Sequence, residues 1–223
     1  MINIKEICYI IGASSDETII NFSANENDFI IAADGGYDLL QKAGINYDVL
    51  LGDFDSIESV PADDNVIKYP VEKDDTDSFL SYKLGYEKGY RSFVVFGGIG
   101  GRLDHTMANT QMLCHMAKNG ARGFLVGENT IVTAIHNSKI MMSPEHSGKI
   151  GVFAHGGVAN GVSISGLKYT ISDGELTSDF PLGVSNEFIG ETTEISVSDG
   201  ALLIIWYEPI EKFLNNIDTY LEV

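Results

Sequence analysis

Long apolar runs and basic residues are both scarce in this sequence. No run approaches the roughly 18 apolar residues that a membrane-crossing helix requires, and Met1–Glu6 lacks the basic segment and apolar core of a secretory signal. We therefore expect a cytoplasmic protein without a membrane partner. Only 14 basic residues stand against 32 acidic ones, for a net charge of −18, so the chain lacks the clustered positive charge that binds nucleic acids.

Cysteine is also scarce, and the common catalytic motifs are missing. Cys8 and Cys114 stand apart, without a CxxC or Cys/His spacing, which argues against a zinc or redox site. The sequence contains no HExxH, no GxSxG and no Lys-Ser/Thr pair after a glycine-rich segment. The five histidines do not cluster, and His105 alone lies near the motifs described below. These absences exclude zinc peptidase, nucleophile-elbow hydrolase and Walker A sites.

The first two-thirds of the chain alternates short apolar strands with amphipathic helices. This alternation predicts an α/β fold with an N-terminal, Rossmann-like, mostly parallel sheet that has helices on both faces. Ligands of such sheets bind outside the carboxyl ends of the strands. The expected strands are residues 7–11, 29–33, 49–51, 66–69, 92–96 and 124–126, and the expected helices are residues 37–43, 77–88 and 104–119.

The pattern changes after about Asn137, where strands follow one another without convincing helices between them. Glycines interrupt this region, including Gly156-Gly157, and predict separate short strands in an antiparallel β-sandwich or barrel. A terminal helix is expected over residues 210–223. We therefore predict two domains, residues 1–137 and residues 138–223. The expected strands of the second domain are residues 149–154, 162–165, 193–197 and 202–206.

Acidic residues follow the strands at the predicted ligand edge. Carboxylates that are brought together repel one another unless a cation lies among them, and Mg²⁺ prefers such hard oxygen ligands. Taken singly, Asp34 also fits a turn, and Asp74 fits a helix N-terminus. As a group they predict a magnesium site. Its candidate members are Asp34, Asp53, Asp55, Asp74, Asp75 and Asp77.

A glycine-rich segment, Gly97–Asp104, follows one strand and opens the next helix. Its glycines allow backbone N–H groups to approach an anion at the positive end of the helix dipole. Arg102 adds a planar fork that suits phosphate oxygens. Asp104 has the alternative role of a helix cap. Together with the acidic cluster, this segment predicts a nucleoside triphosphate site with its metal, in a magnesium-dependent enzyme that transfers a phosphate-containing group from ATP.

These motifs stand in the order and spacing of thiamine pyrophosphokinases, which the sequence resembles over nearly its whole length. The shared motifs are Asp34–Gly36, Gly52–Ser56, Lys73–Asp77, Gly97–His105, Gly166–Tyr169 and Gly183–Glu187. The resemblance implies transfer of the pyrophosphate group of ATP to the hydroxyl of thiamine, which gives thiamine diphosphate and AMP. It also implies an ATP-binding first domain, a thiamine-binding second domain, and a homodimer with active sites at the subunit interface.

The resemblance further implies roles for single residues at the phosphates. Magnesium would be held by Asp53, Asp55 and Asp77, with Asp34 and Asp74 as second choices. The remaining contacts to the triphosphate or adenosine would come from Lys73, Thr76, Gly98, Gly100 and Arg102.

The resemblance also assigns residues to thiamine. Asp104 would position the attacking hydroxyl or take its proton. Tyr169, Ser185 and Asn186 would hold the thiamine rings. Some family members have tryptophan at the position of Tyr169, and tyrosine can also stack on a cationic heterocycle. An acidic site suits the cationic thiazolium as well.

Two alternative functions remain open. The first is a pyrophosphokinase for another small alcohol, such as a pterin, which would keep the motifs of the first domain and change the second. The second is a non-catalytic sensor of a nucleotide or thiamine, which would not need to keep its carboxylates. Formation of AMP from ATP, magnesium and thiamine would separate the three possibilities.

Overall fold

The computed structural model describes residues 6–13, 22–54, 57, 61 and 65–221 as a mixed α/β chain. Two compact units are present, Met1–Asn109 with Leu125–Glu128, and Thr110–Phe124 with Asn129–Val223. Within the described ranges, no helix is both long enough and apolar enough to span a membrane. The expectation of a mixed α/β fold is confirmed, whereas the assignment of ATP and thiamine to residues 1–137 and 138–223 stays a prediction.

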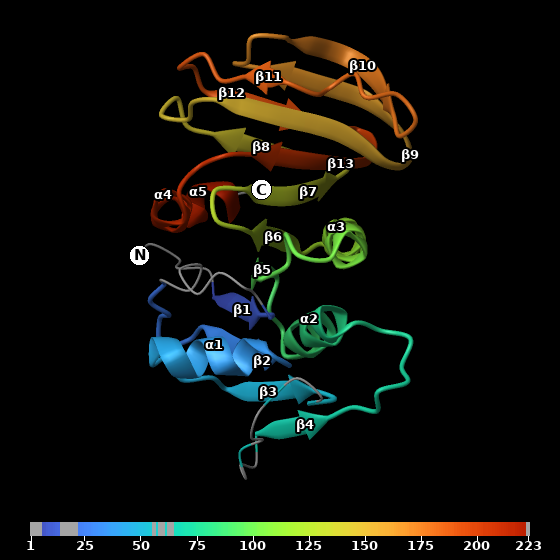
Figure 1. The fold of residues 1–223 in the computed structure, drawn as a ribbon. Coiled ribbons are helices and arrows are strands. Elements are labelled where there is room, and N and C mark those ends of the chain that lie inside the picture. Colours follow the sequence, from blue (N-terminus) through green and yellow to red (C-terminus); the bar gives the residue numbers. More distant parts are fainter. Residues whose placement is uncertain (1–5, 14–21, 55–56, 58–60, 62–64, 222–223) are drawn as a thin grey trace. The chain divides into compact units, whose positions relative to one another are not determined.

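The first unit contains a parallel sheet in the order β4-β3-β2-β1-β5 (Figure 1). All residues of β1 and β5 are buried, which explains their continuous apolar sequence. The chain builds outward from β1 to β4 and then returns to place β5 on the other side of β1. The order therefore reverses between β1 and β5, where doubly wound sheets bind ligands. The strands are β1 Ile7–Ile11, β2 Phe29–Ala33, β3 Val49–Gly52, β4 Val66–Lys68 and β5 Ser92–Phe96.

Three helices begin shortly after the carboxyl ends of strands or the turns that follow them, and they match the helices expected from the sequence. They are α1 Gly36–Ala43, α2 Asp77–Glu87 and α3 Leu103–Lys118. A Cβ atom on Gly36 would overlap the carbonyl oxygen of Ile11, so α1 requires glycine there to start against the end of β1. Thr76 caps α2, because its hydroxyl oxygen accepts the Phe79 N–H at 3.2 Å.

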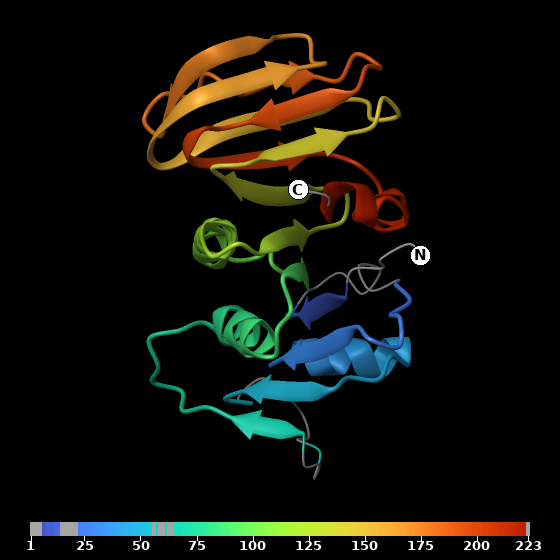
Figure 2. The same cartoon turned by 180° about the vertical axis from the view of Figure 1, so that it is seen from behind.

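The second unit contains antiparallel strands in the order β7-β13-β9-β12-β8, and β10 and β11 also pair with β9 (Figure 2). Whether these strands form a sandwich or a barrel stays a prediction, as does the Rossmann-like class of the first unit. The strands are β7 Ile131–His136, β8 Lys139–Met142, β9 Lys149–Ser165, β10 Ile171–Thr177, β11 Asn186–Glu187, β12 Thr193–Ser196 and β13 Asp199–Trp206, while β6 Arg122–Val126 has residues in both units.

One expectation for this unit was wrong. Residues 149–154 and 162–165 belong to a single strand, β9, rather than to two. Gly156 and Gly157 lie inside it at φ 79° and 135°. The strand continues because β13 pairs with residues on both sides of these glycines, and β10 pairs with the residues after them. The glycines therefore bend the strand without ending it.

The core of the second unit is aromatic and contains a buried polar network. The expected terminal helix is present as α4 Ile210–Asn215 and α5 Ile217–Leu221, which carry Phe213 and Tyr220 into contact with Trp206. The Tyr220 hydroxyl lies 2.6 Å from Nε2 of His146 and donates to Oε1 of Glu208 at 3.0 Å. The indole N–H of Trp206 donates to the same carboxylate oxygen at 2.7 Å. These bonds satisfy polar groups inside an apolar cluster.

Candidate active site

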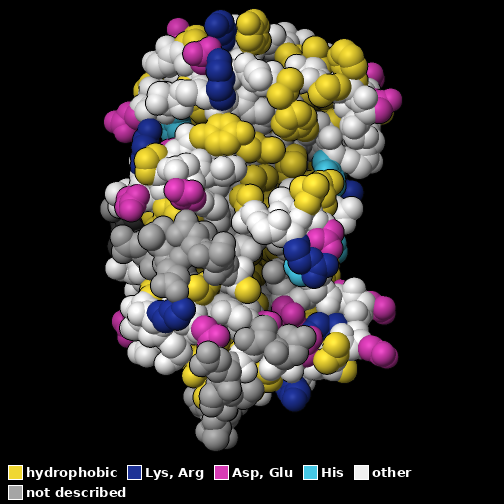
Figure 3. Space-filling view, viewed as in Figure 1, with side chains coloured by type: hydrophobic (Ala, Val, Ile, Leu, Met, Phe, Trp, Pro, Cys, Tyr) yellow, Lys and Arg dark blue, Asp and Glu magenta, His cyan; other side chains and the backbone are white. Residues whose placement is uncertain are grey.

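A hollow of about 200 Å³ opens at the carboxyl ends of β1, β2 and β5, beside the point where the strand order reverses. Figure 3 shows acidic side chains gathered with a basic one on the visible face of this unit. The hollow is therefore in the position expected for the ligand of a parallel sheet. Its lining residues are Gly12, Ala13, Ala33, Asp34, Thr76, Asp77, Ser78, Gly97, His105 and Asn109.

Asp34 lines this hollow from the end of β2, in a left-handed backbone conformation with φ 47°. Its N–H donates to the carbonyl of Leu51 at 2.8 Å, which ties the end of β2 to β3. A Cβ on Gly52 would lie 3.1 Å from both Cα and Cβ of Asp34. Glycine at position 52 thus allows β3 to pass close to Asp34, immediately before Asp53.

Lys73 joins two of the candidate magnesium ligands. Its ammonium lies 2.7 Å from Oδ1 of Asp77 and 3.6 Å from Oδ2 of Asp53, and all three side chains are at most 27% exposed. Burial lowers the pKa of Lys73, but the hydrogen bond and charge of Asp77, with those of Asp53, outweigh burial and raise the pKa above its ordinary value. Two carboxylates therefore converge on one cation position.

The ion pairs of Lys73 do not include Asp74 or Asp75. Asp75 forms an ion pair of 2.6 Å with Lys83, further along α2, and both side chains are partly exposed. Asp74 is exposed. Asp55 lies outside the described residues. Among the residues that the structure describes, no group of three or more His, Cys, Asp and Glu side chains is arranged to hold a metal. The pair Asp53 and Asp77 still fits Mg²⁺, which takes one or two protein carboxylates together with water and substrate phosphate.

The glycine-rich loop is built into the same hollow through Gly97. A Cβ there would lie 2.7 Å from the carbonyl oxygen of Gly12 and 2.8 Å from that of Ala13, and its φ is 72°, so glycine is required. Asn109 is buried on α3 and donates its amide N–H to the carbonyl of Gly98 at 2.9 Å. The sequence prediction missed Asn109, whose only signal was a polar residue on a helix that follows the loop.

Gly100 lies in the outer part of the loop. Its φ is 92°, and a Cβ on it would meet no atom within 4 Å. A side chain at this position would therefore project into open space and obstruct an approaching ligand, although the positive φ is unfavourable for any residue other than glycine.

Arg102 and Asp104 bind each other rather than line the hollow. The guanidinium donates from Nη2 to Oδ2 at 2.6 Å and from Nε to Oδ1 at 3.2 Å, and both side chains are exposed. The hydrogen bond from Arg102 lowers the pKa of Asp104, so this carboxyl keeps its charge and is a weaker proton acceptor. His105, the next residue, does line the hollow.

The candidate thiamine residues of the second unit form one local structure. Tyr169 is 62% exposed. The side chain of Asn186 is buried and hydrogen bonds to both backbone polar groups of Tyr169. Ser185 is exposed and has a left-handed φ of 60°. The structure thus places Tyr169 and Asn186 together, with Asn186 turned toward the protein.

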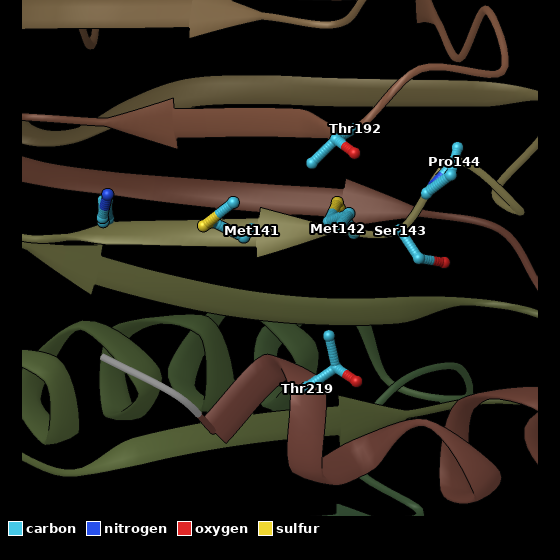
Figure 4. A pocket seen from close by; sticks show the side chains of 7 residues that line it. Met141, Met142, Ser143, Pro144, Thr192 and Thr219 are labelled. Carbon is cyan, nitrogen blue, oxygen red and sulfur yellow. The ribbon is translucent and has the colours of Figure 1, made fainter.

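A second hollow, of about 400 Å³, lies in the second unit beside β8 and α5 (Figure 4). Among the described residues that line it, Lys139 is the one that carries a charge, and it is paired with Glu194 at 2.9 Å. Because methionine, proline and hydroxyl side chains make up the rest of the lining, this larger hollow is not suited to a triphosphate. The lining residues are Lys139, Met141, Met142, Ser143, Pro144, Thr192 and Thr219.

The fold and the comparisons with known proteins agree. The parallel sheet, the paired carboxylates and the glycine loop are features of an α/β transferase of the kinase class. Residues 21–125 match the family model described as the catalytic domain of thiamin pyrophosphokinase, and residues 137–202 match its vitamin B1 binding domain. The chain belongs to the thiamin pyrophosphokinase family.

Individual relatives extend this agreement over most of the chain. Thiamine pyrophosphokinase from Bacillus subtilis is 27% identical over 191 residues, which cover 81% of this chain and 88% of the relative. A crystal structure of the Bacillus subtilis enzyme superposes with a TM-score of 0.80 at 24% identity, covering 92% of this chain and 100% of that one. A Geobacillus thermodenitrificans structure has a TM-score of 0.75 at 24% identity, covering 91% and 97% of the two chains. These structural similarities support the fold.

Proposed function

We propose that the chain transfers the pyrophosphate group of ATP to the hydroxyl of thiamine in a magnesium-dependent reaction. The thiamine oxygen attacks the β-phosphorus of ATP, the bond from that phosphorus to the α,β-bridging oxygen breaks, and AMP leaves. The hydroxyl proton is released to a base or to water. The observation that carries this proposal is the convergence of Asp53 and Asp77 on one cation beside a hollow formed by helix N-termini and a glycine loop.

Asp53 and Asp77 are the proposed magnesium ligands among the described residues, and Asp55 is a third candidate from the sequence. Bound Mg²⁺ would offset the charge of the β- and γ-phosphates. Lys73 holds the two carboxylates together before a metal binds, and its ammonium then remains available to a phosphate oxygen. Asp34 lines the same hollow and can orient water or ribose.

The triphosphate is proposed to lie against the N-terminus of α2 and the glycine loop. Thr76 and Ser78 line the hollow at the start of α2, where unpaired N–H groups and the helix dipole favour an anion. Gly98 and Gly100 belong to the glycine loop, which is proposed to contact the triphosphate with its backbone N–H groups. Arg102 is exposed and can exchange Asp104 for a phosphate, because both are anionic partners of the same guanidinium.

Asp104 is proposed to orient the thiamine hydroxyl. In the free protein its hydrogen bond with Arg102 lowers its pKa, and once Arg102 turns to a phosphate the released carboxylate oxygens are hydrogen-bond acceptors for the hydroxyl. Phosphoryl-type transfer depends mainly on position and charge neutralisation, so a weak base is compatible with the reaction.

Thiamine is proposed to be held by the second unit. Tyr169 offers an exposed ring that can stack on a cationic thiazolium, and Ser185 offers an exposed hydroxyl. The functional assembly is proposed to be a homodimer in which Tyr169 of one subunit reaches the thiamine bound at the aspartates of the other.

The product of ATP tests this function. The chain, incubated with ATP, Mg²⁺ and thiamine, should release AMP, and replacing thiamine with a hydroxymethyl pterin should abolish the release. ADP as the product would contradict pyrophosphate transfer. AMP release with the pterin but not with thiamine would indicate a different alcohol substrate, and no turnover of ATP would favour a sensor.

A further inference from the structure

We propose that Asn186 is a positioning residue that holds the backbone of Tyr169 and thereby fixes the ring that stacks on thiamine. This inference rests on the proposed function, and it replaces the direct contact between Asn186 and thiamine that the sequence predicted. It is carried by the hydrogen bonds of the Asn186 side chain.

The amide of Asn186 binds both backbone polar groups of Tyr169. Its Nδ2 donates to the carbonyl of Tyr169 at 2.7 Å, and its Oδ1 accepts the N–H of Tyr169 at 3.0 Å. Oδ1 also accepts the N–H of Glu187 at 2.9 Å. An amide oxygen has two lone pairs and an NH₂ group has two protons. These three bonds therefore leave one side-chain N–H for any substrate, on a residue that is only 6% exposed.

The surrounding backbone explains why the hydrogen bonds from Asn186 fix the position of Tyr169. The two segments that meet here are already joined at Lys168, whose N–H donates to the carbonyl of Glu187 at 2.9 Å, and by a bridge between Leu167 and Phe188. At the next residue, Tyr169, the side chain of Asn186 takes the place of the opposite backbone and forms the two hydrogen bonds. The ring of Tyr169 then projects outward from a position held on both sides of its Cα.

The charged neighbours of Asn186 stabilise the same platform. Oε2 of Glu187 accepts hydrogen bonds from the ammonium groups of Lys149, at 2.9 Å, and Lys168, at 3.3 Å. These hydrogen bonds lower the pKa of Glu187. The ammonium of Lys168 lies 5.9 Å from the centre of the Tyr169 ring. Tyr169 is thus bordered by residues that are themselves held, which is the arrangement expected of a preorganised aromatic contact.

A double-mutant cycle measured on thiamine turnover tests the proposal. Asn186→Ala should raise the KM for thiamine by about tenfold, roughly the value of a lost hydrogen bond to a positioned group, and should leave the KM for ATP within about twofold. Tyr169→Ala removes the ring but not the backbone groups that Asn186 binds. In that background Asn186→Ala should add less than about a twofold change, because residues that act through each other are not additive. An equal increase in both backgrounds would mean that Asn186 contacts thiamine directly and would overturn the proposal.

Hydrogen exchange gives a readout that is independent of activity. In Asn186→Ala, the amide of Tyr169 should exchange faster by NMR, whereas the amide of Lys168, bound to the Glu187 carbonyl, should change little. Unchanged exchange at Tyr169 would overturn the proposal. Asn186→Leu offers a second variant if Asn186→Ala does not fold, since it has a similar volume, lacks both Oδ1 and Nδ2, and should speed exchange at Tyr169 in the same way. If Tyr169→Ala leaves the thiamine KM unchanged, the positioning proposal fails, whereas absence of AMP release by the unaltered chain would overturn the proposed function itself.

Discussion

Lys73 and Asp77 form an ion pair of 2.7 Å across the residue that caps α2. Oδ2 of Asp53 lies 3.6 Å from the same ammonium. The protein therefore carries its own cation at the position where we propose that magnesium binds. This arrangement relieves the repulsion between the two carboxylates.

Replacing Lys73 with methionine should destabilise the metal-free protein by about 1–2 kcal/mol, because two partly buried carboxylates lose their shared cation. Added Mg²⁺ should restore more stability to Lys73→Met than to the unaltered chain. Urea unfolding with EDTA and with Mg²⁺ measures both effects. Lys83→Met is the matched control, since its pair with Asp75 is more exposed and should change stability by less than about 0.5 kcal/mol.

The same pair predicts a pH dependence. The folded pKa of Lys73 is raised above its unfolded value of 10.5, so its contribution is fully present below that value and is lost as the pH rises through the folded pKa. The stability difference between Lys73→Met and the unaltered chain should therefore be constant from about pH 7 to pH 9. A difference that disappears within this range would contradict the ion pair.

Gly100→Val should raise the KM for ATP much more than the KM for thiamine, because the added side chain enters open space at the proposed phosphate loop. Gly89→Val is the matched control. It has a similar positive φ, 102° against 92°, and open surroundings, but it lies beyond the end of α2, away from the residues that line the hollow. Equal changes in the two KM values, or equal effects of the two variants, would count against the loop.

A mixed dimer tests the proposed interface. Asp53→Asn should lose at least about a thousandfold in turnover, since a metal-bound oxygen and its charge are removed, and Tyr169→Ala should impair thiamine binding. In a dimer of one chain of each kind, a shared site leaves one of the two sites without either lesion. Differently tagged chains, purified as the mixed dimer, should then recover AMP release at subsaturating thiamine. Absence of recovery would show that Tyr169 serves its own subunit.

Tyr220→Phe should destabilise the protein by about 1–3 kcal/mol, because the lost hydroxyl leaves buried groups of His146 and Glu208 without their shared partner. The buried indole of Trp206 reports the unfolding by fluorescence. Tyr207→Phe is the control, since Tyr207 is exposed and its replacement should have an effect below about 0.5 kcal/mol. Equal stabilities of the two variants would contradict the network.

Much of the first unit was predictable, because the residues that follow the carboxyl ends of parallel strands lie at the same edge of the sheet. Asp34, Thr76 and Asp77 meet at the hollow for that reason, although Asp34 is far from the other two in the sequence. Asn109 was not predictable, since a single polar residue on an amphipathic helix does not show that its amide reaches the carbonyl of Gly98. That contact depends on how α3 packs.

The second unit shows the limits of local patterns more clearly. Gly156-Gly157 suggested a break, but β9 continues past these glycines because β13 pairs with it on both sides of them. Asn186 lies within a recognisable motif, yet the motif does not reveal that its side chain turns inward to bind Tyr169. In both cases long-range hydrogen bonds override the local signal.

The most direct test of pyrophosphate transfer follows the γ-phosphate of labelled ATP. The chain is incubated with Mg²⁺, thiamine and ATP that carries ³²P at the γ position, and the products are separated. The proposed reaction predicts labelled thiamine diphosphate and unlabelled AMP in equal amounts, with Asp53→Asn as the inactive control. Labelled thiamine monophosphate together with ADP would contradict it, because those products require transfer of a single phosphoryl group.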